Sequence, residues 1–241
     1  MEQRPSKRRI RPLDAWRAIR VLIQNPDDTG QVFRIIDALS GNSGERLFQR
    51  FRRDPMGARI LGERRSLLTT LSDRAALKAL PAGSLGRIYA DFTRREQITA
   101  DGLVDASMEG ERIDRGPERR LFGERLRDSH DLWHVVTGYG RDLVGEAALL
   151  SFSFAQTRNP GVGFIVAVAW LKAGRGEARR LIVDGFRRSR RAAWFPATDW
   201  ETALTLPLDE VRRQLRIEPA PPYEAIRSTG APPVELRRNA A

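Results

Sequence analysis

Apolar residues recur three and four positions apart along most of the chain, and this spacing is typical of α-helices that bury one face. Between residues 14 and 23 the pattern is carried by Trp16, Ile19 and Ile23, and Asn25-Pro26 then interrupts it. Similar segments, separated by short polar or glycine-containing breaks, continue almost to the C-terminus. The sequence therefore predicts an all-α fold.

The expected helices form a single multi-helix domain over residues 13–225, with a basic flexible arm at residues 1–12 and a disordered tail at residues 226–241. Ser43 is expected to cap the third helix, because serine is a preferred N-cap residue. Residues 101–118 are polar and contain glycine, and the pattern leaves open whether they form a loop or a short strand pair. Helices are expected at residues 14–23, 31–39, after Ser43, 63–79, 84–98, 118–137, 142–157, 161–173, 176–194 and 208–216, followed by an extended exit at Pro219, Pro221 and Pro222.

Composition narrows the class of protein and the chemistry available to it. The 241 residues are 41% hydrophobic and 30% charged, which is an ordinary globular composition, and the net charge is +11. The absence of cysteine excludes disulfides, thiolate zinc sites and cysteine nucleophiles. The positive charge favours an anionic partner, but no zinc-finger, RRM or bZIP pattern is present, so we expect no nucleic-acid partner.

The most apolar run is too short to cross a membrane, since residues 162–171 are about half of the ~20 that a spanning helix needs. No apolar signal-peptide core follows the basic N-terminus, so we expect an intracellular protein, cytoplasmic or peripheral on the inner face of the membrane, and not a secreted one. A basic cluster within residues 175–191 is interleaved with Leu181, Phe186 and Trp194. This pattern fits either a helix on a membrane surface or a core-packing helix with a solvated basic face.

Only two histidines occur, His130 and His134, and they are four residues apart beside Asp131. On a helix these three side chains occupy a narrow arc, where two imidazoles and a carboxylate can bind a divalent metal ion. An ordinary helix surface that carries two histidines by chance is the alternative. Asp131 also lies where the general base of His-Glu-x-x-His would be, but a third histidine is absent, so a zincin-like hydrolase is a minor option.

Glu146 can join this group only if the chain turns. In a continuous helix it would lie about 18 Å along the axis from His134. Gly138 and Gly140 favour a turn, and Asp142 is a good N-cap for a second helix. The sequence therefore predicts a helix–turn–helix hairpin whose two arms both contribute metal ligands.

The same segment resembles the central block of a known family. His130-Asp131-x-x-His134, eleven further residues and Glu146 form the signature motif of the Coq4 family of ubiquinone (coenzyme Q) biosynthesis proteins. The surrounding stretch, HDLWHVVTGYGRDLVGEAALLSFSFAQ, is similar to that block almost throughout, and the resemblance covers about residues 30–225. Further similar pieces lie at residues 54–61, 80–89 and 207–219, whereas residues 101–116 and 117–127 depart from the family's pattern.

The resemblance implies a divalent metal ion, usually zinc, held by His130, Asp131, His134 and Glu146. If Glu146 coordinates weakly or not at all, the remaining two histidines and one carboxylate suit iron instead. It implies metal-dependent oxidative decarboxylation at ring carbon 1 of a prenylated 4-hydroxybenzoate, although no catalytic residue is identified. The alternative is a non-catalytic lipid-binding scaffold that organises quinone-biosynthesis enzymes at the membrane. The implied partners are a prenylated quinone precursor, the membrane surface, other quinone-biosynthesis proteins and, as an option, a second copy of the chain in a homodimer.

Three residues near the motif are candidates for binding the precursor. Arg141 and Arg158 are close enough in sequence to help hold an anionic head group. Phe154 belongs to an apolar set that also includes Leu149 and Phe152 and that could line a groove for a polyprenyl tail. The alternative interpretation of this set is ordinary core packing.

Overall fold

The computed structural model describes residues 9–26, 28–98 and 116–226. Most of the predicted N-terminal arm, the predicted tail and the polar stretch at 101–118 therefore lie outside the described residues. Apart from one isolated β-bridge, the regular secondary structure of the described residues is entirely helical. The predicted all-α class is therefore confirmed. The helices are α1 (Pro12–Gln24), α2 (Thr29–Leu39), α3 (Ser43–Arg53), α4 (Pro55–Gly62), α5 (Leu67–Ser72), α6 (Arg74–Ala79), α7 (Leu85–Arg95), α9 (Pro117–Asp128), α10 (His130–Thr137), α11 (Leu143–Thr157), α12 (Pro160–Lys172), α13 (Glu177–Arg191), the 3₁₀ turn η1 (Phe195–Ala197), α14 (Trp200–Thr205) and α15 (Leu208–Gln214).

Several predicted boundaries are wrong. The helix expected at 63–79 is divided at Asp73, whose carboxylate accepts a hydrogen bond from the Ala76 N–H and caps α6. The helix expected at 118–137 is divided at Ser129 into α9 and α10. Ser43 does not cap α3, because it is the first helical residue and its hydroxyl donates to the Ser40 carbonyl.

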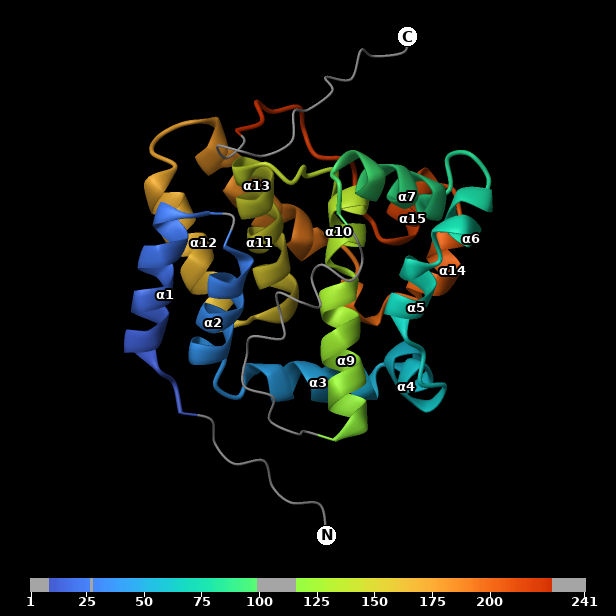
Figure 1. The fold of residues 1–241 in the computed structure, drawn as a ribbon, viewed down its shortest axis with the longest axis horizontal. Coiled ribbons are helices and arrows are strands. Elements are labelled where there is room, and N and C mark those ends of the chain that lie inside the picture. The colour runs from blue at the N-terminus through green and yellow to red at the C-terminus, as the bar shows by residue number, and fades with distance from the viewer. Residues whose placement is uncertain (1–8, 27, 99–115, 227–241) are drawn as a thin grey trace.

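The helices lie in three groups across the molecule (Figure 1). The first group, α1, α2 and α12, forms one edge and encloses a small apolar cluster of its own. The middle of the molecule holds α11 and α13, beside α9 and α10. The other side is built from α5, α6, α7, α14 and α15, and α3 and α4 lie at the lower edge of this view.

The largest core cluster lies directly behind α10. Trp133 of α10 meets the ring of Phe195 edge to face with centroids 5.4 Å apart, and Phe195 is in turn packed against Phe152 at 4.9 Å and Trp200 at 5.8 Å. Trp133 and Val136 also belong to this cluster, which therefore anchors α10 in the core.

The basic helix α13 packs along α11 and is a core-packing helix. Leu181, Ile182, Gly185 and Ser189 are buried, and the Ser189 hydroxyl donates to the Phe152 carbonyl at 2.8 Å. Gly185 allows the closest approach, because a Cβ at that position would lie 2.3 Å from the Ala148 carbonyl oxygen. The buried face of α13 is therefore covered by the protein itself. Arg187, Arg190 and Arg191 are exposed, whereas Arg188 is largely buried and donates to the Thr137 carbonyl.

A buried ion pair holds the end of α9 that leads into the motif helix. The Arg125 side chain is 2% exposed, and its guanidinium donates to the two carboxylate oxygens of Glu201 at 2.7 and 2.6 Å. This bidentate geometry is the strong form of the arginine–carboxylate contact. Helix α14, which supplies Glu201, was not predicted from the sequence.

Candidate metal centre

Helix α10 ends where the sequence predicts a turn. Gly138 has φ 81°, a left-handed conformation that favours glycine, and its N–H donates to the His134 carbonyl. Residues 131–137 are all buried, so the helix is held in place over its whole length. The His130 side chain is 29% exposed at the first residue of α10.

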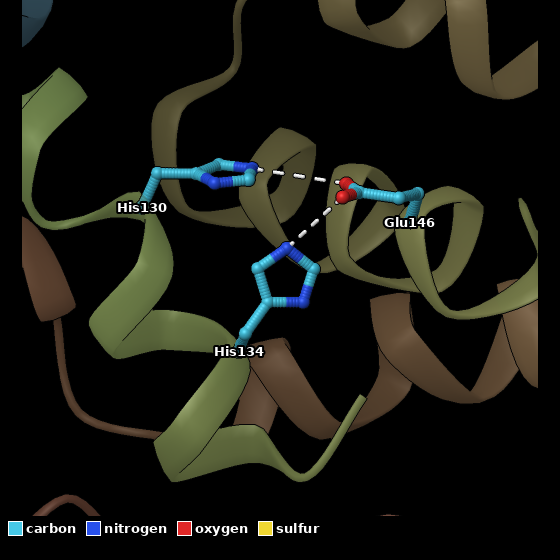
Figure 2. A group of neighbouring side chains, drawn as sticks. All are labelled: His130, His134 and Glu146. Atoms are coloured by element: carbon cyan, nitrogen blue, oxygen red, sulfur yellow. Dashed lines mark ion pairs between the residues drawn. The ribbon is translucent and has the colours of Figure 1, made fainter. Parts of the chain in front are cut away.

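Helix α11 begins at the predicted cap and returns beside α10. The Asp142 carboxylate accepts hydrogen bonds from the Val144 and Gly145 N–H groups, each at 3.1 Å. Glu146 follows in the first turn of α11, so its side chain faces the histidines of α10 (Figure 2). The hairpin thereby brings together residues that a continuous helix would keep far apart.

Three of the four predicted ligands converge. The His134 Nε2 atom lies 3.3 Å from Glu146 Oε1, and the His130 Nε2 atom lies 3.9 Å from Glu146 Oε2 (Figure 2). The two imidazole rings are 4.8 Å apart between centroids. One ligand atom from each of the three residues lies within 4.8 Å of the others, which is close enough to surround a metal ion.

The fourth predicted ligand, Asp131, points elsewhere. Its Oδ1 atom lies 3.4 Å from His130 Nδ1, on the opposite side of the imidazole ring from the nitrogen that faces Glu146. The cause is helix geometry, because neighbouring residues on a helix point about 100° apart and do not face a common point. A carboxylate at Nδ1 can orient an imidazole for a metal at Nε2.

A backbone carbonyl orients His134 in a similar way, also through the Nδ1 atom. The His134 Nδ1 atom lies 2.9 Å from the Tyr139 carbonyl, so it carries the proton and donates this hydrogen bond. The Nε2 atom of His134 is buried and makes no hydrogen bond with any residue that the structure describes. A buried ring nitrogen that has no hydrogen-bond partner and faces a carboxylate is a suitable metal ligand.

The charges of the group favour binding a cation. Burial by itself lowers the pKa of His134, but the carboxylates of Glu146 and Asp131 and the Tyr139 carbonyl together raise this pKa above its usual value. Burial opposes ionisation of Glu146, whereas the charges of His134, His130 and Arg141 lower the pKa of Glu146 to about 2. The Glu146 carboxylate is therefore ionised and carries the negative charge that a cation needs.

The predicted head-group residues are separated by the fold. The Arg141 Nε atom lies 3.6 Å from Glu146 Oε1, directly beside the candidate site. Arg158 is the C-cap of α11, twelve residues beyond Glu146 and about 18 Å away along the helix axis. Arg141 and Arg158 therefore lie beyond opposite ends of α11.

The apolar residues proposed to line a groove for a polyprenyl tail also lie in different places. Leu149 and Phe152 are completely buried in the main core, so ordinary core packing accounts for them. Phe154 is partly buried and packs against Phe186 of α13 with ring centroids 6.2 Å apart. It lies eight residues, or about 12 Å along α11, beyond Glu146.

Two aromatic residues at this site were not predicted from the sequence. Phe92 of α7 is stacked on His134 with ring centroids 6.1 Å apart. The Tyr223 hydroxyl accepts a hydrogen bond from the Gly140 N–H at 2.8 Å and donates to Asp142 Oδ2 at 2.6 Å. Tyr223 lies in a proline-containing segment whose pattern indicates only an extended exit, so no sequence signal marked it.

Among the described helices none is long and apolar enough to span a membrane. Helix α12, which contains the most apolar run, has only 13 residues. This agrees with the prediction made from the length of that run.

Comparison with proteins of known family agrees with the motif. The model of the family described as coenzyme Q (ubiquinone) biosynthesis protein Coq4 matches residues 13–221. Three similar proteins are named as mitochondrial ubiquinone biosynthesis proteins of this type. The one from Schizosaccharomyces japonicus is 29% identical over 196 residues, which are 78% of this chain and 80% of that protein. The Danio rerio homolog is 32% identical over 190 residues, 76% of this chain and 67% of that protein.

The third, from Neurospora crassa, is 30% identical over 176 residues. These are 72% of this chain but 49% of the relative, so the chain spans about half the length of that protein. A crystal structure from Nostoc punctiforme shares the fold, with a TM-score of 0.64 at 20% identity, covering 86% of this chain and 98% of that one. On the match of the family model, the chain belongs to the Coq4 family of coenzyme Q (ubiquinone) biosynthesis proteins.

Proposed function

We propose that this protein is a metal-dependent enzyme of ubiquinone biosynthesis that acts at ring carbon 1 of a prenylated 4-hydroxybenzoate. The observation that carries the proposal is the convergence of His130 Nε2, His134 Nε2 and the Glu146 carboxylate at the end of the hairpin. A metal held by three protein ligands keeps a coordination position for substrate, whereas a structural zinc site is normally closed by four. The three-residue group therefore supports catalysis over a purely structural metal.

The ligand set is compatible with two metals. Two histidines and a glutamate hold zinc in hydrolytic enzymes, and two histidines with one carboxylate also hold iron in oxygen-dependent enzymes. We propose zinc, with iron as the alternative. In this proposal His130, His134 and Glu146 hold the ion, and Asp131 orients His130 through its Nδ1 atom. When bound, the metal supplies Lewis-acid stabilisation of a carboxylate or phenolate oxygen.

The proposed reaction exchanges the ring carboxyl group for a hydroxyl group. The bond between ring carbon 1 and the carboxyl carbon breaks, carbon dioxide leaves, and a new carbon–oxygen bond forms at the same ring position. The balance requires an external oxidant of the dioxygen class together with two electrons and two protons, which gives one water molecule. Arg141 lies beside Glu146 and is the residue we assign to the substrate carboxylate.

Release of labelled carbon dioxide tests the enzymatic proposal. Purified protein loaded with zinc or with ferrous iron is incubated with prenylated 4-hydroxybenzoate labelled in its carboxyl group, dioxygen and a two-electron reductant. We expect labelled carbon dioxide and the ring product hydroxylated at carbon 1 from wild-type protein, and neither from His134→Ala. Binding of the substrate without release of carbon dioxide under either metal would contradict catalysis and favour the lipid-binding scaffold.

A prenylated substrate resides in a membrane, and the outer face of α1 fits contact with an anionic bilayer. Leu13 and Trp16 are 71% and 57% exposed, and Arg17 and Arg20 are exposed on the same face. The opposite face of α1 is buried through Ala15, Ala18 and Ile19. Exposed tryptophan and leucine beside arginine are typical of helices that lie in the bilayer interface.

Sedimentation with phosphatidylglycerol-containing vesicles tests this contact. Replacing Leu13 and Trp16 together with serine is expected to weaken vesicle binding about tenfold or more, because two apolar side chains no longer enter the bilayer. Ile226→Ser is the matched control, since it removes an apolar side chain that is 52% exposed in another part of the chain. Equal binding by wild type and the double variant would contradict membrane contact through α1.

A further inference from the structure

After α15 the chain returns to the metal-site hairpin and crosses its turn. We call residues 217–226 the C-terminal strap. The Ala220 N–H donates to the Thr137 carbonyl at the end of α10, and the Leu143 N–H donates to the Ile226 carbonyl at the start of α11, both at 2.8 Å. The strap is therefore hydrogen-bonded to both arms of the hairpin, on either side of the turn between them.

Tyr223 joins the strap to the turn itself. Its hydroxyl accepts from the Gly140 N–H at 2.8 Å and donates to Asp142 Oδ2 at 2.6 Å. The other oxygen of that carboxylate, Oδ1, caps α11 and also accepts from the Ile226 N–H at 3.3 Å. One phenol thus links the middle of the turn to the cap of the helix that carries Glu146.

The Tyr223 hydroxyl lies closely against two glycines of the hairpin. A Cβ at Gly145 would lie 2.5 Å from the Tyr223 hydroxyl, and one at Gly140 would lie 3.1 Å from it. A Cβ at Gly145 would also lie 2.2 Å from the Gly140 carbonyl oxygen, so the two ends of the turn are in direct contact. Glycine at both positions lets the turn close against the phenol.

The segment fixed by Tyr223 carries the groups that shape the candidate metal centre. The Tyr139 carbonyl, next to Gly140, holds His134 Nδ1, and Glu146 follows Gly145 directly. A shift of the turn would move the Glu146 arm relative to the two histidines. Small displacements matter, because a metal site requires ligand positions within about 0.5 Å of the productive geometry.

We infer that Tyr223 is a positioning residue for the metal centre, holding the turn at residues 138–146 so that Glu146 stays opposite His130 and His134. This inference rests on the metal site put forward under Proposed function. It assigns the C-terminal strap a role in metal affinity in addition to its contribution to the fold. Loss of an outer-shell partner of this kind typically weakens metal binding 10- to 100-fold.

The experiment compares two side-chain hydroxyls that differ in what they hold. Tyr223→Phe removes the bond to the turn, whereas Ser189→Ala removes a buried hydroxyl on α13 that donates to the Phe152 carbonyl of α11 at 2.8 Å, outside the ligand group. Affinity is measured by titration of the whole chain with Co²⁺, followed by visible absorption. We expect about tenfold weaker Co²⁺ binding for Tyr223→Phe and wild-type affinity for Ser189→Ala.

Hydrogen exchange in the metal-free protein provides a second measurement. Amides of residues 138–146 are expected to exchange faster in Tyr223→Phe than in Ser189→Ala, because only the first variant releases the turn. Asp142→Asn is a second variant that keeps a capping residue but replaces the oxygen that accepts from Tyr223, and it is expected to weaken Co²⁺ binding in the same direction.

The outcomes separate this inference from the function on which it rests. Wild-type protein that binds no Co²⁺ would overturn the metal centre and the role of Tyr223 with it. Wild-type protein that binds Co²⁺ with the same affinity as both Tyr223→Phe and Asp142→Asn would overturn the role of Tyr223 alone. Equal weakening by Tyr223→Phe and Ser189→Ala would also overturn it, since the effect would then be a general loss of stability.

Discussion

Glu146→Gln is expected to bind its divalent metal about 100-fold more weakly than the wild-type protein, or not at all. Loss of an outer-shell partner already costs up to about 100-fold, and this change removes the only carboxylate in the ligand group that the structure brings together. The substitution preserves the shape of the side chain, so the loss of affinity follows from the loss of charge. His134→Ala is expected to have an effect of similar size, because it removes the buried nitrogen that faces Glu146.

Titration with Zn²⁺ against a competing chelator measures this effect, and metal analysis gives the stoichiometry. Glu124→Gln is the matched control, because Glu124 is an exposed glutamate on α9 and lies outside the ligand group. We expect one metal per chain for wild type and for the control. Unchanged affinity and stoichiometry in Glu146→Gln would show that the metal binds elsewhere or that Glu146 does not hold it.

Gly185→Ala is expected to lower the free energy of unfolding by about 3 kcal/mol. A Cβ at Gly185 would lie 2.3 Å from the Ala148 carbonyl oxygen, so α13 must move away from α11. The clashing oxygen belongs to the backbone and cannot rotate aside. The expected destabilisation therefore lies at the upper end of the range for overpacked cores. The better helix propensity of alanine recovers only about 1 kcal/mol.

Gly123→Ala is the matched control for this prediction. Gly123 also lies inside a helix, α9, but a Cβ there meets no atom of the described structure within 4 Å. We expect this variant to be more stable than wild type by about 1 kcal/mol, because only the propensity gain remains. Urea denaturation measures both changes, and a stability change of the same sign in the two variants would contradict close α11–α13 packing as the cause.

Much of the fold follows from local sequence signals. The apolar spacing predicts most of the helices, and Gly138 and Asp142 predict where the hairpin turns. The breaks at Asp73 and Ser129 were not predicted, because neither contains glycine or proline and both depend on local capping and burial. Helix α14 has only six residues, which is too short for a periodic pattern to stand out.

Only part of the candidate site could be predicted from the sequence, and the reason differs from the reason for the missed helix boundaries. The spacing of His130, His134 and Glu146 follows from helix geometry and one turn, so these residues could be predicted to meet. Closeness in sequence does not fix where a side chain points: Asp131 contacts His130 Nδ1, and Arg158 lies at the far end of α11 from Glu146. Tyr223 comes from a segment distant in sequence, and its contacts are tertiary.

Ubiquinone content in a host that lacks its own member of this family is the most direct test of the central claim, that the hairpin is a functional metal site of quinone biosynthesis. The host is supplied with wild type, Glu146→Gln or the Glu124→Gln control, at matched protein levels. The account predicts restored ubiquinone with wild type and with the control, and none above the deficient background with Glu146→Gln. Full restoration by Glu146→Gln would contradict it.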